Sequence, residues 1–285
     1  MRIRKLLRVR FVVDPFTEQE KIMAELTPMM QKYMETKEQY KDCILFYRLG
    51  DFYEMFFDDA LVASKELEIT LTGKSCGLEE RAPMCGIPYH AVEGYLSKLV
   101  SRGYKVAICE QVEDPKLAKG LVKREVIRVV TPGTNLNVQS LEAGKNNYLL
   151  SIAYTPDGIG ISAADVTTGD YYVTEVEDLK KLNDELMKYE PSEIICNEAF
   201  LVSGFDVNDL KTRLHISVNA LESHMFDDDG CRRILMKHFK VNTLIGLGVE
   251  EFPTGLLAAG ALLQYLYDTQ KTDLEHFTHI YPYLT

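Results

Sequence analysis

The spacing of apolar residues predicts a mixture of helices and strands in residues 23–134. Thr27 and Pro28 are expected to begin a helix that runs to Tyr40, because threonine caps a helix and proline suits its first turn. Gly50-Asp51 predicts a tight turn, and the loop that follows the second helix is expected over residues 73–86. The expected strands are Cys43–Arg48, Phe52–Phe57, Lys105–Gln111 and Glu125–Val130. The other expected helices are one capped by Asp58 or Asp59, with Leu61, Val62, Leu67 and Ile69 on its apolar face, and one over Ala91–Arg102.

The second half of the chain carries a different order of elements. Three consecutive apolar segments are separated by turn sequences, which is typical of paired strands. These segments are Leu149–Tyr154, Ile159–Asp165 and Tyr171–Glu175. A helix over Leu179–Tyr189, a strand over Glu193–Cys196 and a long helix over Phe252–Thr272 are expected to follow. Three strands followed by alternating helix and strand favour an α/β sheet of ribonuclease H-like order, after an α+β first domain.

Composition and charge restrict the possible functions. The chain is 46% hydrophobic and 26% charged, as in a globular protein, and no apolar run approaches the ~18 residues of a membrane helix. The six cysteines form no C-x-x-C pair, which argues against a zinc module and a disulfide scaffold. Residues 1–22 carry six Lys/Arg against three Asp/Glu, residues 23–134 carry 15 against 17, and residues 135–285 carry 11 against 23. Any DNA contact is therefore expected before residue 135.

Phe52 and Glu54 form the most informative pair in the sequence. In an extended strand alternate side chains share one face, so these two residues are expected to point together, with Tyr53 opposite. On an exposed face, the ring could wedge into a base stack while the carboxylate reads a base edge. On the residue pattern alone, a core phenylalanine beside a solvated glutamate is the more ordinary interpretation.

Four sequence blocks follow one another over the first domain. They are Gly-Asp-Phe-Tyr-Glu at 50–54, Ala-Pro-Met-Cys-Gly-Ile-Pro-Tyr-His-Ala at 82–91, Val-Ala-Ile-Cys-Glu-Gln at 106–111 and Arg-Val-Val-Thr-Pro-Gly-Thr at 128–134. Together they closely resemble the MutS family of DNA mismatch repair proteins. The similarity extends from Thr27 to near the C-terminus, weakens in the second domain and does not cover residues 1–22.

The resemblance implies a role for each member of the Phe-x-Glu motif. Phe52 would stack on a mispaired or unpaired base from the minor groove and help to kink the duplex, and Glu54 would hydrogen-bond that base, protonated in some contexts. A mismatch has weakened stacking, so the kink costs less there than in matched DNA. Lys74 stands where the family carries a basic residue near the DNA backbone. The other candidate DNA-binding residues are Met84, His90, Lys123, Arg124 and Arg128, each of which has an ordinary packing or surface role as the alternative.

The resemblance also implies four segments. They are an N-terminal extension that is disordered or non-native (1–22), a mismatch-recognition domain with a mixed sheet (23–134), a ribonuclease H-like connector (135–270) and the truncated start of the lever or core region (271–285). No Walker A sequence, G-x-x-x-x-G-K-[ST], occurs in the 285 residues, so the chain is not expected to be an enzyme or to bind a cofactor. ATP and Mg²⁺ belong to the C-terminal part of the family.

The expected partners are double-stranded DNA with mismatches or small insertion or deletion loops, and a MutL-type protein docked on the connector. The full-length family forms homodimers, whereas this chain is expected to be a monomer in the bacterial cytoplasm, associated with the nucleoid and with no membrane. DNA binding is expected to be weak and salt-sensitive. The alternative function is a protein-interaction fragment that docks a MutL-type partner and has negligible DNA binding of its own.

A metal-dependent nuclease is the third hypothesis, since ribonuclease H-like nucleases hold Mg²⁺ with carboxylates. Asp165 and Asp170, with Glu193 or Glu198, are the candidates, but Asp170 is expected on the far side of a hairpin from Asp165. No metal site is expected elsewhere. Residues 227–230, Asp-Asp-Asp-Gly, are interpreted as a turn. The histidines without metal-like spacing are His215, His224, His238, His276 and His279.

Overall fold

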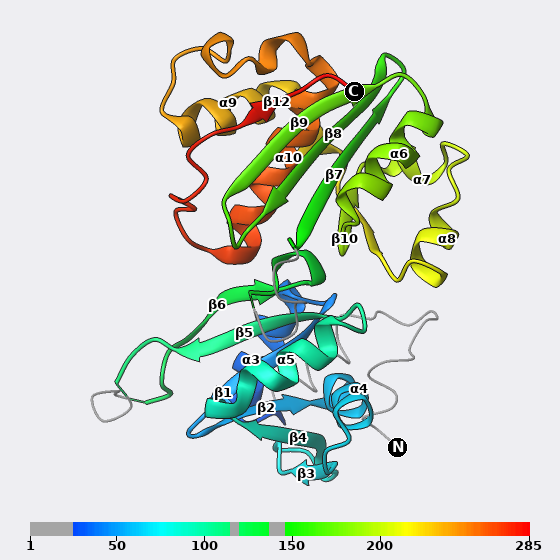
Figure 1. Ribbon diagram of the computed structural model, residues 1–285. Coiled ribbons are helices and arrows are strands. Elements are labelled where there is room, and N and C mark those ends of the chain that lie inside the picture. Colours follow the sequence, from blue (N-terminus) through cyan, green and yellow to red (C-terminus); the bar gives the residue numbers. More distant parts are fainter. Residues whose placement is uncertain (1–24, 115–119, 137–145) are drawn as a thin grey trace, which may run out of the picture. The chain divides into compact units, whose positions relative to one another are not determined.

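The computed structural model describes residues 25–114, 120–136 and 146–285 (Figure 1). The expected N-terminal extension, residues 1–22, lies outside them. The chain divides into two compact units, with the division between Val129 and Val130. Unit 1 and unit 2 each contain a six-stranded sheet of mixed strand directions, flanked by helices. Two mixed α/β domains are therefore confirmed.

Unit 1 is built on the sheet β3-β4-β2-β1-β5-β6. Strand β2 is antiparallel to β1 and to β4, whereas β1 is parallel to β5, so the sheet is mixed as predicted. The strands are β1 (Cys43–Leu49), β2 (Phe52–Phe56), β3 (Thr72–Lys74), β4 (Ala82–Pro88), β5 (Lys105–Gln111) and β6 (Arg124–Val130). The helices are α3 (Pro28–Gln39), α4 (Phe57–Leu67) and α5 (Val92–Val100), with a 3₁₀ turn η1 (Tyr89–Ala91).

Helix α3 starts as the sequence predicts and covers part of one sheet face. The Thr27 hydroxyl accepts a hydrogen bond from the Met30 N–H, at 3.4 Å, and Pro28 occupies the first turn. Tyr33 of α3 is fully buried and packs edge-on against Tyr47 and Phe56, with ring centroids 5.4 and 4.9 Å apart. Helix α3 is thereby fixed on the two strands that carry the candidate site.

The predicted start of α4 is wrong. The helix begins at Phe57 without a side-chain cap, so Asp58 and Asp59 lie in its first turn. Leu67 is buried as predicted, whereas Leu61 is 46% exposed and Ile69 lies beyond the end of the helix. The Asp59 carboxylate is buried instead of capping the helix. It accepts hydrogen bonds from the Leu45 N–H and lies 2.9 Å from the Lys37 ammonium, which links α4 to β1 and α3.

The predicted loop over residues 73–86 is also wrong, because it contains most of β3 and β4. Gly73 and Pro83 favour a loop when the sequence is taken locally, yet they are cross-strand partners at the edge of the sheet. β3 is the edge strand, and Pro83 of β4 lies one position beyond the last pair with β2, Phe56 and Met84, so it has no β2 residue opposite it. Tertiary pairing therefore overrides the local composition.

Unit 2 is built on the sheet β11-β10-β7-β8-β9-β12. Strands β7, β8 and β9 are antiparallel neighbours, and β10 and β11 continue the sheet in parallel with β7. The strands are β7 (Tyr148–Thr155), β8 (Gly158–Asp165), β9 (Asp170–Val176), β10 (Glu193–Cys196), β11 (Ser217–Ala220) and β12 (Tyr281–Pro282). The helices are α6 (Leu179–Tyr189), α7 (Glu198–Leu201), α8 (Val207–Thr212), α9 (Asp228–Phe239) and α10 (Pro253–Gln270).

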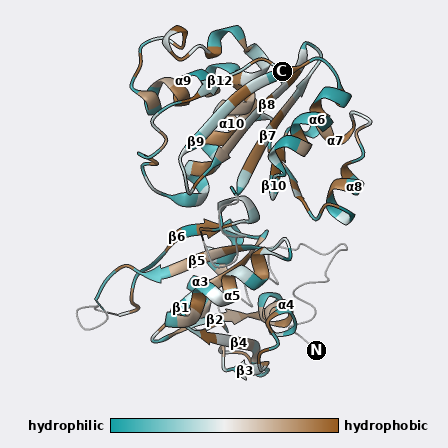
Figure 2. Ribbon diagram, in the orientation of Figure 1, coloured by the Kyte–Doolittle hydropathy of each residue, from teal (hydrophilic) through white to brown (hydrophobic). Residues whose placement is uncertain are grey.

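Two apolar clusters lie on opposite faces of this sheet. One joins α9 and α10 to one face, and the other joins α6 to the opposite face. Figure 2 shows hydrophobic residues along β7 and α10, which form the centre of the unit. Among the described residues, no helix is long and apolar enough to cross a membrane.

Two segments of unit 2 differ from their sequence interpretation. Residues 227–230 were expected as a turn, but Asp227 caps α9 by accepting a hydrogen bond from the Gly230 N–H at 2.9 Å. Residues 271–285, expected to begin a further region, pack on unit 2. Phe277 and Ile280 are buried beside α10, and β12 pairs with β9.

Candidate nucleic-acid interface

The β1–β2 hairpin carries the predicted Phe-x-Glu motif at one end of the sheet of unit 1. Leu49 and Phe52 are the last cross-strand pair, so the turn has only two residues. Gly50 adopts φ +58°, a left-handed conformation that glycine reaches without steric cost. The turn places Phe52 at the open end of β2, where its side chain is 48% exposed, while Tyr53, Met55 and Phe56 of the same strand are buried.

Phe52 and Glu54 share one face of the sheet, as the alternation predicts. Gly86 of β4 lies opposite Glu54, and a Cβ there would approach the Glu54 Cγ to 3.6 Å and the Phe52 Cδ1 to 3.9 Å. Both side chains therefore flank a position without a side chain. The absence of a Cβ leaves the face of this strand pair open beside the ring and the carboxylate.

Lys74 joins this pair from β3. Its ammonium lies 2.5 Å from the Glu54 carboxylate and 5.6 Å from the centre of the Phe56 ring. The Glu54 side chain is 15% exposed and that of Lys74 is 32% exposed, so water shields the pair only in part. In this structure the Glu54 carboxylate is neutralised by a lysine ammonium.

The opposite face of the hairpin is held by a network that the sequence analysis missed. The Arg48 guanidinium contacts the Glu110 carboxylate at 3.1 Å and stacks 3.7 Å from the centre of the Tyr89 ring. The Tyr53 hydroxyl donates to Glu110, and burial and then this hydrogen bond raise the pKa of Tyr53. The Tyr89 N–H donates to the Asp51 carbonyl at 3.0 Å. These contacts fix the turn that precedes Phe52.

Met84 lies near the start of β4, whereas His90 follows its end. Met84 pairs with Phe56 across β2 and is partly buried against the core. His90 is exposed in η1, where its ring packs edge-on against Tyr89 at 5.8 Å. Met84 has a packing role in this structure, whereas the His90 imidazole is open to solvent.

The three basic candidates near β6 do not form one cluster. The Arg124 guanidinium donates to the Arg48 carbonyl at 2.7 Å and lies 5.3 Å from the centre of the Tyr47 ring, opposite Glu54. Lys123 is exposed and pairs with Glu125 at 2.6 Å, which raises the Lys123 pKa. Arg128 is half-buried, and burial lowers the pKa of its guanidinium. The structure therefore joins Lys74 to Glu54 directly, holds Arg124 against the Tyr47 ring, and pairs Lys123 with Glu125.

The comparisons with known proteins show which family contains both units. A family model described as MutS domain I matches residues 27–139, and one described as MutS domain II matches residues 147–278. This chain belongs to the MutS family. Proteins named DNA mismatch repair protein MutS are similar to it over most of its length: 67% identical over 92% of the chain in Lachnoclostridium phytofermentans, and 52% over 92% in Acetivibrio thermocellus. The chain spans 28% and 30% of the length of these two relatives.

In MutS domain II, two of the carboxylates considered for a nuclease, Asp165 and Glu193, are buried and used for structure. Asp165 and Asp170 are direct cross-strand partners and share a face, so the expectation that they lie on opposite sides of the hairpin is wrong. The reason is that residues 166–169 close the hairpin directly between them. The fully buried Asp165 carboxylate accepts hydrogen bonds from the Thr167 N–H at 2.8 Å and the Asn147 N–H at 3.0 Å.

Glu193 is likewise committed to structure. Its carboxylate is fully buried and accepts hydrogen bonds from the Gly133 N–H at 3.0 Å, the Asn219 amide at 3.1 Å and the Tyr265 hydroxyl at 2.7 Å. Within the described part of the chain, no group of three or more His, Cys, Asp and Glu side chains could hold a metal ion. The candidate site that remains in this MutS chain is the end of strand β2 in domain I, where Phe52 and Glu54 lie.

Proposed function

We propose that unit 1 recognises mispaired or unpaired bases in double-stranded DNA through Phe52 and Glu54. The observation that carries this proposal is the half-exposed Phe52 ring at the end of a strand whose other apolar residues are buried. A phenylalanine held in water by a rigid turn is suited to enter a base stack. Membership of the MutS family, whose domain I is a mismatch-binding domain, supports the same function.

The physical basis of recognition is a difference in deformation energy. Inserting a ring between base pairs requires unstacking, which costs a few kcal/mol per step, and a mismatch has already lost part of that stacking. Stacking of a base on an aromatic ring returns about 1–3 kcal/mol. The Glu54 carboxylate, 15% exposed beside the ring, would accept or share a proton with the edge of the displaced base. Lys74 and Arg124 would face the backbone phosphates, and so would His90, which lies in the turn after Pro88, the cross-strand partner of Phe52.

For unit 2 the proposal is a ribonuclease H-like connector that docks a MutL-type protein. Three antiparallel strands, β9-β8-β7, followed in space by the parallel strands β10 and β11, support that fold assignment. The docking role comes from the family resemblance alone. ATP hydrolysis and dimerisation remain proposals for the whole protein, because the chain spans less than a third of its relatives.

The test is fluorescence anisotropy at low salt with a G·T duplex, a duplex with one unpaired T, and the matched duplex. We expect the parent chain to prefer the mismatched duplexes, and Phe52→Ala to lose about tenfold in affinity for them, the equivalent of ~1.4 kcal/mol. Leu61→Ala is the matched control, since Leu61 is 46% exposed on α4 and lies outside the candidate interface.

Equal affinity for all three duplexes, unchanged by Phe52→Ala, would refute the proposal for this chain. That outcome would favour the alternative function, in which the chain docks a protein partner and binds DNA negligibly.

A further inference from the structure

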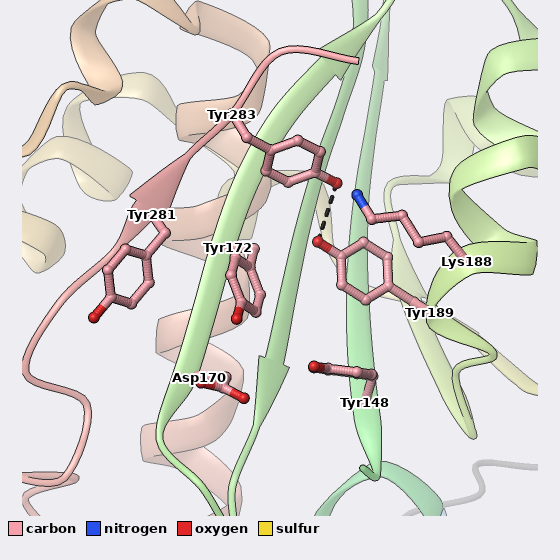
Figure 3. Close-up of a pocket in the computed structure, with 7 residues that line it drawn as sticks. All are labelled: Tyr148, Asp170, Tyr172, Lys188, Tyr189, Tyr281 and Tyr283. Carbon is pink, nitrogen blue, oxygen red and sulfur yellow. Dashed lines mark hydrogen bonds between the residues drawn. The ribbon is translucent and has the colours of Figure 1, made fainter. Parts of the chain in front are cut away.

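Unit 2 contains a pocket whose walls are tyrosine rings (Figure 3). The cavity has a volume of about 560 Å³ and lies where α6 ends beside the sheet. It is lined by Tyr148, Asp170, Tyr172, Lys188, Tyr189, Tyr281 and Tyr283. The rings come from β7, β9, α6 and the C-terminal segment, so the pocket is formed only when distant parts of unit 2 fold together.

The tyrosine rings surround a central member, Tyr172. Its ring centroid lies 5.8 Å from that of Tyr281, 6.1 Å from that of Tyr189 and 6.4 Å from that of Tyr283. Burial and then the charge of Asp170 raise the pKa of Tyr172, and burial also raises that of Tyr148. The phenols of Tyr172 and Tyr148 are therefore neutral at neutral pH, and the charged side chains of the pocket are Asp170 and Lys188.

Lys188 is already matched within the protein. Its ammonium pairs with the Glu185 carboxylate at 3.1 Å and lies 3.9 Å from the centre of the Tyr283 ring. The structure thus contains a cation held over one tyrosine face of this pocket. Since the electron-rich face of an aromatic ring attracts cations, the same chemistry is open to a cation from outside.

Asp170 is the charge left to a ligand. In Figure 3 its carboxylate lies at the end of the pocket away from Lys188, below Tyr172 and beside Tyr148. The Asp170 carboxylate accepts a hydrogen bond from the Asn146 side-chain amide at 3.4 Å. It forms no ion pair with any residue that the structure describes. Helix α6 ends at Tyr189, so the negative end of the helix dipole also faces this region.

We propose that this tyrosine pocket binds the guanidinium group of an arginine presented by a protein partner. A guanidinium is planar and weakly hydrated, stacks on aromatic faces and pairs with a carboxylate through two parallel hydrogen bonds, which fits tyrosine walls with Asp170 at one end. The surrounding charge favours the same partner, because residues 135–285 carry 23 Asp/Glu against 11 Lys/Arg. An anionic ligand would meet Asp170 and this excess of negative charge. The inference involves unit 2 alone and does not rest on DNA binding by unit 1.

The test uses the full chain with ring-labelled tyrosine, observed by NMR while N-acetyl-arginine-N-methylamide is added. We expect saturable shifts of the pocket tyrosines, assigned through single Tyr→Phe variants, and weaker shifts with the lysine analogue. Asp170→Asn is expected to weaken binding about tenfold. Asp157→Asn, an exposed carboxylate on the β7–β8 turn, is the matched control and should leave binding unchanged.

Three outcomes would overturn the inference: no saturable shift of the pocket tyrosines, equal binding of the arginine and lysine probes, or binding that survives Asp170→Asn. Circular dichroism and thermal unfolding of each variant show that it is folded, so a lost signal reports on the pocket. Loss of mismatch preference in unit 1 leaves these results unaffected, so the two proposals fail separately.

Discussion

Replacing Glu54 with glutamine removes one negative charge from the candidate DNA interface and releases Lys74 from its partner. The Lys74 ammonium and the Glu54 carboxylate are 2.5 Å apart, and their side chains are 32% and 15% exposed. A phosphate that binds Lys74 must therefore compete with a carboxylate that is already in contact. The Glu54→Gln variant keeps the shape of the side chain and abolishes this competition.

The size of the effect follows from the burial of the pair. Fully exposed ion pairs contribute about 0.2–1 kcal/mol, and breaking a buried pair costs about 3–5 kcal/mol. Because the Lys74–Glu54 pair is intermediate in exposure, we discount it for solvent screening to about 1–1.4 kcal/mol. Glu54→Gln should then bind matched DNA about five- to tenfold more tightly at low salt. One additional phosphate contact should also steepen the salt dependence by about 0.9 in log K against log salt.

The assay is a double-mutant cycle measured by anisotropy on matched duplex over a range of salt concentrations. The four proteins are the parent, Glu54→Gln, Lys74→Met and the double variant. We expect the gain of Glu54→Gln to disappear in the double variant, because the released ammonium is then absent. Lys98→Met, an exposed lysine on α5, replaces Lys74→Met in a control cycle and should preserve the gain.

Two results would refute this reasoning. The first is a gain of equal size with and without Lys74, which would mean that the lost negative charge acts at long range. The second is weaker binding of matched DNA by Glu54→Gln, which would mean that the carboxylate already contributes to binding ordinary duplex. A mismatch preference that falls while matched affinity rises is the expected signature of a discriminating carboxylate.

Two further predictions concern stability. Lys37→Met should destabilise the chain by about 3 kcal/mol, because it leaves the buried Asp59 carboxylate without its cation. The control, Lys32→Met on the exposed side of α3, should change the free energy of unfolding by less than about 0.5 kcal/mol. Burial raises the Asp59 pKa and Lys37 lowers it, so the protonated form of Asp59 adds stability at low pH, which is lost as the pH rises through the folded pKa. The loss of unfolding free energy in Lys37→Met, measured by urea unfolding, should therefore be smaller at about pH 5 than at about pH 8. An equal loss at both pH values would contradict this account. Gly260→Ala should destabilise the protein by about 1–3 kcal/mol, because the new Cβ would lie 2.2 Å from the Cys231 Cβ of α9. Gly246→Ala is the control: its Cβ meets open space, so thermal unfolding should be unchanged.

Elements with strong local signals were predictable from the sequence. Strands β5 and β10 have the predicted bounds because each is a short, largely apolar segment. Helix α6 has them because its apolar residues share one face and Asp178 caps its start. The errors at α4 and at residues 73–86 share a cause. Asp59 is buried by contacts with residues far away in sequence, and β3 and β4 exist through pairing with each other and with β2. Neither kind of contact is visible in a local window.

The candidate site was predictable only in part. Alternation along a strand gives the shared face of Phe52 and Glu54, whereas the half-exposed state of the ring depends on the turn at Gly50 and on the open position at Gly86. The Lys74 contact joins residues 20 positions apart, and the Arg48–Glu110 contact joins residues 62 apart. A residue pattern without the family resemblance contains no signal for either pair.

The arrangement of unit 1 is suited to the proposed role of Phe52 as a probe of base stacking. Leaving Phe52 in water gives up part of the ~1.5–3 kcal/mol that full burial of a phenylalanine contributes. The network of Arg48, Tyr53, Glu110 and Tyr89 on the opposite face holds the turn, so the ring does not need to be ordered when it meets DNA. Ordering a loop and its side chains on binding would cost about 0.5–1.5 kcal/mol for each immobilised side chain. Because that cost falls on folding and not on binding, the small stacking difference between a mismatch and a matched pair is left to decide affinity.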